Sequence, residues 1–186
     1  YINCKHTITN EFNEKKLNLK RSERTGADNL RLEKGLIHEV DYFKELSKKY
    51  KKVKNIKVLK NLSKEEKIKE TNKALKDGYE LIYGGWLKSG NWSGELDFLE
   101  INNKVKSNLG NYSYEITDTK NSSKVKGDHI YQVCLYSFLL QEAQGILSDN
   151  FFILLKDKSK EFIKLNEVYD TFLLHKNSYE NFIKNE

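Results

Sequence analysis

Apolar side chains recur with a helical period from Asp28 onward, and this pattern predicts one long amphipathic helix. Ser63 and Glu66 have the spacing of a capping box, which predicts the start of a second helix that Gly78 can end in a left-handed conformation. We expect the apolar stripe of the first helix to pack on the core. The stripe consists of Leu32, Leu36, Val40, Phe43, Leu46 and Tyr50.

The rest of the chain predicts several strands and two more helices. The expected strands are Val53–Leu59, Tyr79–Tyr83, Trp92–Ile101, Tyr112–Lys120, Phe151–Leu155 and Phe162–Leu165, and the expected helices are Asp128–Gln144 and Glu167–Lys184. Gly84-Gly85 is expected to break the second strand, and Gly145 to end the first of these helices. This order of elements predicts the α/β class, with a mixed central sheet flanked by helices.

Length and composition favour a folded domain over residues 28–186, preceded by a polar segment, residues 1–27, that packs on it. No apolar run approaches the ~18 residues of a membrane span, so we expect no membrane partner. The chain begins at Tyr1 and has no Met, so we expect further domains of a longer polypeptide. Cys4 and Cys134 are too few for a disulfide framework or a four-cysteine zinc or iron–sulfur site, and we expect the reducing cytoplasm.

The formal net charge of +6 is compatible with a nucleic-acid partner, because lysines over phosphates gain affinity by releasing counterions. Lys and Asn are abundant throughout the chain, however. A general compositional bias explains the charge equally well.

Candidate chemistry is sharpest at Asp118 and Lys120. Strand alternation places these two side chains on one face with Tyr114 and Ile116. A carboxylate can hold a hard cation there while an ammonium group lies near a phosphate. The same acid-x-Lys spacing occurs at Glu14 and Glu65, so the pattern alone carries little weight.

Two more acids strengthen this interpretation. Asp97 lies between Leu96 and Phe98 on the neighbouring predicted strand, which is unfavourable unless its carboxylate turns toward a polar site or a cation. The alternative is an exposed Asp on an edge strand. Glu39 falls on the apolar side of the first helix, where a divalent cation or a salt bridge to a lysine must compensate its charge.

Three other polar residues have weaker individual signals. His38 lies about 100° round the helix from Glu39, off the apolar stripe, which favours a polar surface position. Gln132 and Tyr136 are one helical turn apart and can bond jointly to a phosphate, a water molecule or a lysine.

These motifs resemble, in order and type, the RecB-like branch of the PD-(D/E)XK nuclease superfamily, and most of all the RecB-like nucleases often followed by a ribonuclease H-like domain. They span roughly Asp28 to Leu155 and comprise His38-Glu39, Gly94–Asp97, Asp118–Lys120 and Gln132–Tyr136. The resemblance implies a restriction-endonuclease-like core and a Mg²⁺- or Mn²⁺-dependent nuclease that hydrolyses phosphodiester bonds, in DNA rather than RNA. Some relatives hold an iron–sulfur cluster through four cysteines, and none is expected here.

The resemblance also implies roles for individual residues. Asp97, Asp118, the backbone carbonyl of Thr119 and either His38 or Glu39 would hold the metal, with Glu39, Asp97, Asp118 and Lys120 as the catalytic set. Gln132 and Tyr136 would position the substrate or the lysine. The resemblance implies that His38 is a metal ligand, whereas the helical period places it at the polar surface. Both interpretations stay open. Two other functions also remain: a nucleic-acid-binding module that does not cleave but targets other domains, and a lysine-rich protein-interaction domain.

Overall fold

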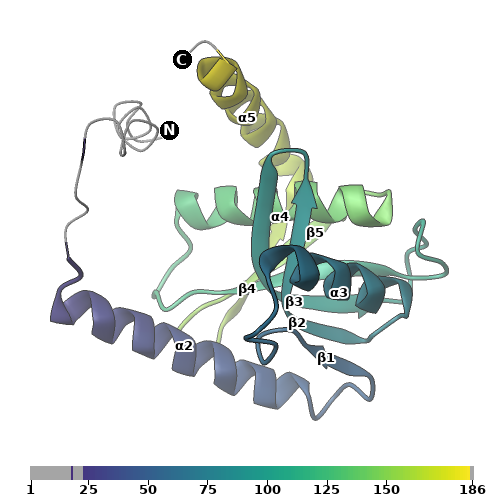
Figure 1. Ribbon diagram of the computed structural model, residues 1–186, viewed down its shortest axis with the longest axis horizontal. Helices are drawn as coiled ribbons and strands as arrows, with labels where there is room; N and C mark the ends of the chain where they lie inside the picture. The colour runs from purple at the N-terminus through teal and green to yellow at the C-terminus, as the bar shows by residue number, and fades with distance from the viewer. Residues whose placement is uncertain (1–17, 19–22, 185–186) are drawn as a thin grey trace.

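The computed structural model describes residue 18 and residues 23–184, which form a six-stranded mixed sheet with helices on both faces (Figure 1). The α/β class is therefore confirmed. The helices are α2 (Gly26–Leu46), α3 (Lys64–Lys76), α4 (Gly127–Gln144) and α5 (Tyr169–Lys184), with a 3₁₀ turn at Leu165–Glu167. The strands are β1 (Val53–Asn55), β2 (Leu81–Ser89), β3 (Trp92–Asn102), β4 (Ser113–Thr119), β5 (Asn150–Leu154) and β6 (Lys160–Lys164).

The strands lie in the sheet in the order of the chain, from β1 to β6. The β1–β2 and β4–β5 pairs are parallel, with α3 and α4 as their crossover helices, and the other pairs are antiparallel. One hydrophobic cluster joins α3, α4 and α5 to one face, and a smaller one joins α2 to the other. In Figure 1, α2 accordingly lies on the opposite side of the sheet from α3 and α4.

Helix α2 begins at a capping box, in which the side chains of Thr25 and Asp28 each accept a hydrogen bond from the other's backbone N–H. The expected apolar stripe is buried only in the second half of the helix. Leu46 is buried, whereas Leu32 and Leu36 are 53% and 54% exposed, so the expectation that they pack on the core is wrong. The reason is geometric, because the first half of α2 extends past the edge of the sheet (Figure 1).

An aromatic stack fixes α2 on the sheet. Tyr83 on β2 lies between Phe43 and Phe98, with ring centroids 4.3 and 5.1 Å away. Tyr42 meets the Phe98 ring edge-on at 5.1 Å. Offset and edge-on aromatic contacts add to the stabilisation from burial, so this stack determines how close α2 comes to β2 and β3.

The expected strand break at Gly84-Gly85 is wrong, because β2 continues through both glycines to Ser89. Gly84 adopts φ +69°, which glycine accommodates without strain, while Tyr83 and Gly85 stay paired with Phe98 and Leu96. The distortion is therefore confined to one position, opposite Asp97.

Three of the expected helix and strand bounds are wrong. Helix α2 ends at Leu46, before Tyr50; the last helix begins at Tyr169 after a 3₁₀ turn; and the strand expected over Val53–Leu59 ends at Asn55, where the chain turns.

The predicted helix caps are confirmed. Ser63 and Glu66 form the capping box of α3, Gly78 takes φ +64°, and Gly145 ends α4 in the left-handed conformation. Among the described residues, no helix is long and apolar enough to cross a membrane. Most of the polar segment 1–27, including Cys4, lies outside the described residues.

Candidate active site

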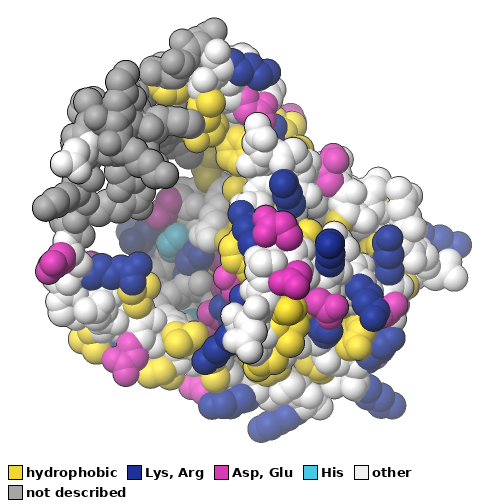
Figure 2. All heavy atoms as spheres, in the orientation of Figure 1, with side chains coloured by type: hydrophobic (Ala, Val, Ile, Leu, Met, Phe, Trp, Pro, Cys, Tyr) yellow, Lys and Arg dark blue, Asp and Glu magenta, His cyan; other side chains and the backbone are white. Residues whose placement is uncertain are grey.

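The predicted acids meet where β3 and β4 separate. The antiparallel ladder between these strands ends at the Phe98–Thr117 pair, so Asp97 and Asp118 occupy the next position on each strand. Glu39 approaches from α2 on one side of the sheet, near enough for its charge to act on both aspartates. Figure 2 shows the molecule hollowed beside α2, with acidic, basic and histidine side chains together in the hollow.

Asp97 is held by Thr119 across the gap between the strands. Its Oδ2 accepts hydrogen bonds from the Thr119 backbone N–H at 2.8 Å and from the Thr119 hydroxyl at 2.7 Å. Asp97 therefore turns inward to a polar partner, and the alternative of an exposed edge-strand Asp is wrong. The predicted role of the Thr119 carbonyl as a ligand stays a prediction.

Asp118 is buried, only 1% exposed, and forms an ion pair with Lys120. Burial raises the pKa of the Asp118 carboxyl from its ordinary value of 3.8 to about 7, and the negative charge of Asp97 acts in the same direction. The ammonium group of Lys120 opposes this shift only in part. Tyr114 and Ile116, on the same strand face, belong to the core cluster, as the alternation predicts.

Glu39 is buried on the inner side of α2, as its place on the apolar side predicts. Burial and the charge of Asp97 raise the pKa of its carboxyl, while an ion pair with Lys57 lowers it. The lysine salt bridge weighed as an alternative to a cation is thus present. Burial alone would lower the pKa of Lys57, but Glu39 and the other carboxylates outweigh burial and raise it.

Lys57 is the principal residue that sequence reasoning missed. Its ammonium group contacts Glu39, lies 3.6 Å from a carboxylate oxygen of Glu95 and lies 5.3 Å from the centroid of the Tyr83 ring. Its aliphatic stem crosses Gly84 where any Cβ would clash with it. A glycine inside a strand can indicate such a close approach, and this was the available signal.

Gly94 and Tyr136 belong to separate motifs but touch in the fold. A Cβ at Gly94 would lie 2.6 Å from Cε1 of Tyr136, so the glycine makes room for the phenol ring against β3. The amide of Gln132 donates to the Tyr136 hydroxyl oxygen at 2.6 Å, which places this pair as one unit on α4. Burial and the charges of Asp118 and Asp97 raise the pKa of the Tyr136 hydroxyl, so the hydroxyl lies near these acids.

His38 lies on a different side of α2 from Glu39. It lines a cavity with Leu154, the residue paired with Thr119, and it is half-buried rather than on the open surface. The structure thus places Glu39 near Asp97. His38 lies instead near Leu154 on β5, which pairs with Thr119 at the end of β4.

Three buried polar atoms of the candidate site have no hydrogen-bond partner among the described residues, and two of them are in ion pairs with lysine. Three buried side-chain atoms in the described part of the chain lack a hydrogen-bond partner: Nε2 of His38, Oε1 of Glu39 and Oδ2 of Asp118. Lysine ammonium groups contact the two carboxylate oxygens as ion pairs. Of these three atoms, Nε2 of His38 alone has neither a hydrogen bond nor an ion pair, and buried polar atoms are rarely left so.

The side chains are not preassembled around an ion. Within residues 23–184 and residue 18, no group of three His, Cys, Asp or Glu side chains is arranged to hold a metal as it stands. Lys57, Lys120 and Thr119 each engage one of the three acids. A bound ion would have to replace lysine as the partner of Glu39 and Asp118.

No family model matches the sequence, and neither does any curated protein.

Proposed function

We propose that this chain is a metal-dependent nuclease that hydrolyses phosphodiester bonds, in DNA rather than RNA. The observation that carries the proposal is the meeting of Glu39, Asp97 and Asp118 with Lys120 at the divergence of β3 and β4. Burial raises the pKa of the Glu39 and Asp118 carboxyls, and the negative charge of Asp97 acts in the same direction. Titratable groups with shifted pKa values that gather in one place are typical of functional sites.

The residues divide into ligands and groups that act on the substrate. Asp97, Asp118 and either Glu39 or His38 would hold Mg²⁺ or Mn²⁺. The ion, when bound, supplies a Lewis acid that neutralises charge on the scissile phosphate. The ammonium group of Lys120, once released from Asp118, donates to a phosphate oxygen and stabilises the negative charge that develops there.

Gln132 and Tyr136 act as a positioning pair. Because the Gln132 amide donates to the phenol oxygen, the Tyr136 O–H is directed to a different acceptor, toward the acids and the phosphate. Gly94 fixes the distance between this pair and β3. Thr119 donates two hydrogen bonds to the Asp97 carboxylate and so fixes the orientation of this proposed ligand.

A cleavage assay tests the proposal directly. End-labelled single- and double-stranded DNA and RNA are incubated with Mg²⁺, Mn²⁺ or chelator. We expect DNA cleavage that depends on metal and falls at least about a hundredfold in Asp118→Asn and Lys120→Ala. Asp170→Asn, an exposed aspartate on α5, is the matched control. Unchanged cleavage in Asp118→Asn would refute the assignment.

The second candidate is a nucleic-acid-binding module that does not cleave and serves other domains of a longer polypeptide. The observation that favours it is that Lys57 and Lys120 already neutralise two of the acids. Metal titration separates the two functions, because a degenerate site has no saturable binding of Mg²⁺ or Mn²⁺. The lysine-rich interaction domain is the third possibility, and negligible DNA affinity at moderate salt would support it.

A further inference from the structure

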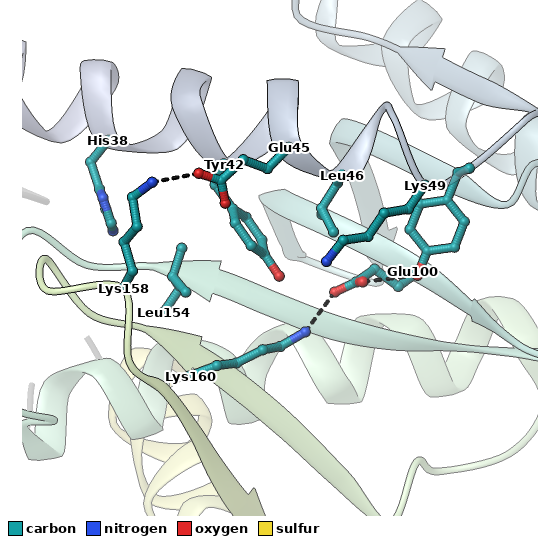
Figure 3. Close-up of a pocket in the computed structure, with 10 residues that line it drawn as sticks. His38, Tyr42, Glu45, Leu46, Lys49, Glu100, Leu154, Lys158 and Lys160 are labelled. Carbon is teal, nitrogen blue, oxygen red and sulfur yellow. Dashed lines mark hydrogen bonds and ion pairs between the residues drawn. The ribbon is translucent and has the colours of Figure 1, made fainter.

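A cavity of about 250 Å³ lies beside the acid cluster, between α2 and the part of the sheet from β3 to β6. Figure 3 shows Tyr42 reaching from α2 into its middle, with His38, Lys158 and Leu154 on one side and Glu100 and Lys160 on the other. The cavity lies near the proposed catalytic site, since His38 adjoins Glu39 in sequence and Leu154 pairs with Thr119. Among the residues given a role above, His38 alone lines this cavity, as the alternative metal ligand to Glu39.

One end of the cavity is a fixed polar network around Glu100. Its carboxylate accepts hydrogen bonds from the Tyr50 hydroxyl at 3.0 Å and the Thr117 hydroxyl at 2.5 Å, and the Lys160 ammonium group lies 3.0 Å away. The same ammonium group lies 5.9 Å from the centroid of the Tyr42 ring. Aromatic and cationic groups therefore share one wall.

The other end carries a charge held in an uncommon backbone conformation. Lys158 has φ +68°, which residues other than Gly, Asn and Asp rarely adopt, and its ammonium group contacts Glu45 on α2. That ion pair is exposed and contributes little to stability. The positive φ belongs to the tight turn between β5 and β6, which the Leu155 N–H closes by donating to the Ser159 carbonyl. Nε2 of His38, which lines the same cavity, is buried without a partner.

We propose that this cavity binds one unpaired nucleotide of the substrate strand, next to the phosphate that is cleaved. A base stacks on Tyr42, phosphate oxygens meet Lys158, and a polar atom of the nucleotide satisfies His38. Aromatic rings combined with lysines are the usual means of binding single strands without regard to sequence. The cavity is large enough for one base, and the bases of a single strand are free to turn into it, so the substrate class that we propose is a single strand. This inference rests on the proposed nuclease function for the position of the scissile phosphate.

Binding measurements without cleavage test the cavity separately from catalysis. Affinity for a fluorescein-labelled single-stranded DNA oligonucleotide, and for the matching duplex, is measured in chelator at several salt concentrations. We expect the single strand to bind more tightly than the duplex. Tyr42→Leu should weaken single-strand binding about tenfold through lost stacking. Equal or tighter binding of the duplex overturns the proposal.

Lys158→Gly is the sharper variant because it separates binding from stability. Glycine relieves the positive φ, so Tm should stay equal or rise, whereas removal of one phosphate contact should reduce the slope of log affinity against log salt by about 0.7. Lys76→Ala, an exposed lysine on α3 over the opposite face, should leave affinity and slope unchanged. If Lys158→Gly binds as tightly as wild type with the same slope, the cavity does not bind the strand.

The two proposals can fail independently. Weaker single-strand binding in Tyr42→Leu and Lys158→Gly, with no cleavage by the wild-type protein in either metal, supports the nucleotide cavity and refutes the nuclease. Metal-dependent cleavage that is lost in Asp118→Asn, with unchanged binding in both cavity variants, supports the nuclease and overturns the cavity.

Discussion

The ring of Tyr136 occupies the space that a side chain at Gly94 would need, with Cε1 only 2.6 Å from an ideal Cβ position. The motif around Gly94 on β3 and the motif around Tyr136 on α4 therefore pack directly against each other. The glycine has a negative φ, so its role is not conformational freedom but close approach of a ring to a strand.

Gly94→Ala should therefore displace Tyr136 and destabilise the fold by about 1 to 3 kcal/mol through overpacking. Gly94→Ala/Tyr136→Ala should recover part of that loss, because the smaller side chain removes the clash. Denaturant unfolding of the two single variants and the double variant measures the coupling. Strictly additive costs would show that the two residues do not compete for this space.

Lys57→Met should leave Glu39 as a buried carboxylate without its counter-charge. We expect a loss of about 2 kcal/mol at pH 8. The loss should be smaller at pH 5, because the raised pKa of Glu39 allows it to take up a proton there. Unfolding at both pH values measures this, and Lys57→Met/Glu39→Gln should restore most of the stability. Gly84→Ala should also destabilise the fold, since its Cβ meets the lysine stem and alanine is strained at φ +69°.

Asp118 predicts how the metal-free protein responds to pH. Its pKa is raised from 3.8 to about 7 in the folded state, so the folded state binds the proton more tightly than the unfolded state. The free energy of unfolding should therefore fall as pH rises between these values and level off above them. At pH 8, in chelator, Asp118→Asn should be more stable than wild type by at least about 1 kcal/mol. A less stable Asp118→Asn at that pH would contradict the assigned cause.

Divalent cations should offset the loss of stability that the ionised Asp118 carboxylate causes at high pH. Mg²⁺ or Mn²⁺ binds the folded state and not the unfolded one, so at a hundredfold excess over Kd it should stabilise by about 2.7 kcal/mol. Thermal unfolding with and without metal measures the shift. Asp97→Asn and Asp118→Asn should abolish it, and Asp170→Asn should retain it in full. A shift that persists in both site variants would place the ion elsewhere.

Cys134 should be chemically inert in the native protein. It is fully buried in α4, and burial raises the pKa of its thiol to about 12, so almost no thiolate is present at neutral pH. Iodoacetamide labelling followed by peptide mapping distinguishes Cys134 from Cys4. Labelling of Cys134 should require denaturant, and rapid labelling under native conditions would disprove its burial.

The sequence predicted those parts of the site that periodicity encodes. Alternation along β4 placed Asp118 and Lys120 together, the helical period placed Glu39 inward, and the pairing of β3 with β4 brought Asp97 to Asp118. Each of these positions follows from the geometry of one element or of two neighbours.

Lys57 and the cavity could not be predicted in this way. Lys57 lies beyond the end of β1 among other lysines, and only the distortion at Gly84 admits its stem. The exposure of Leu32 and Leu36 likewise depends on where the sheet ends beneath α2, which no local pattern records. These are tertiary relationships between segments with no common periodicity.

The order of the strands has a consequence for how the site assembles during folding. Asp97 and Asp118 lie on consecutive antiparallel strands and meet by closing a short loop, whereas Glu39 must return from a helix that precedes the whole sheet. Contacts between near neighbours in the chain form faster than distant ones. We therefore expect the β3–β4 hairpin to be an early structure and the docking of α2 to be a late one, so that the third carboxylate joins the other two only after the sheet can hold it.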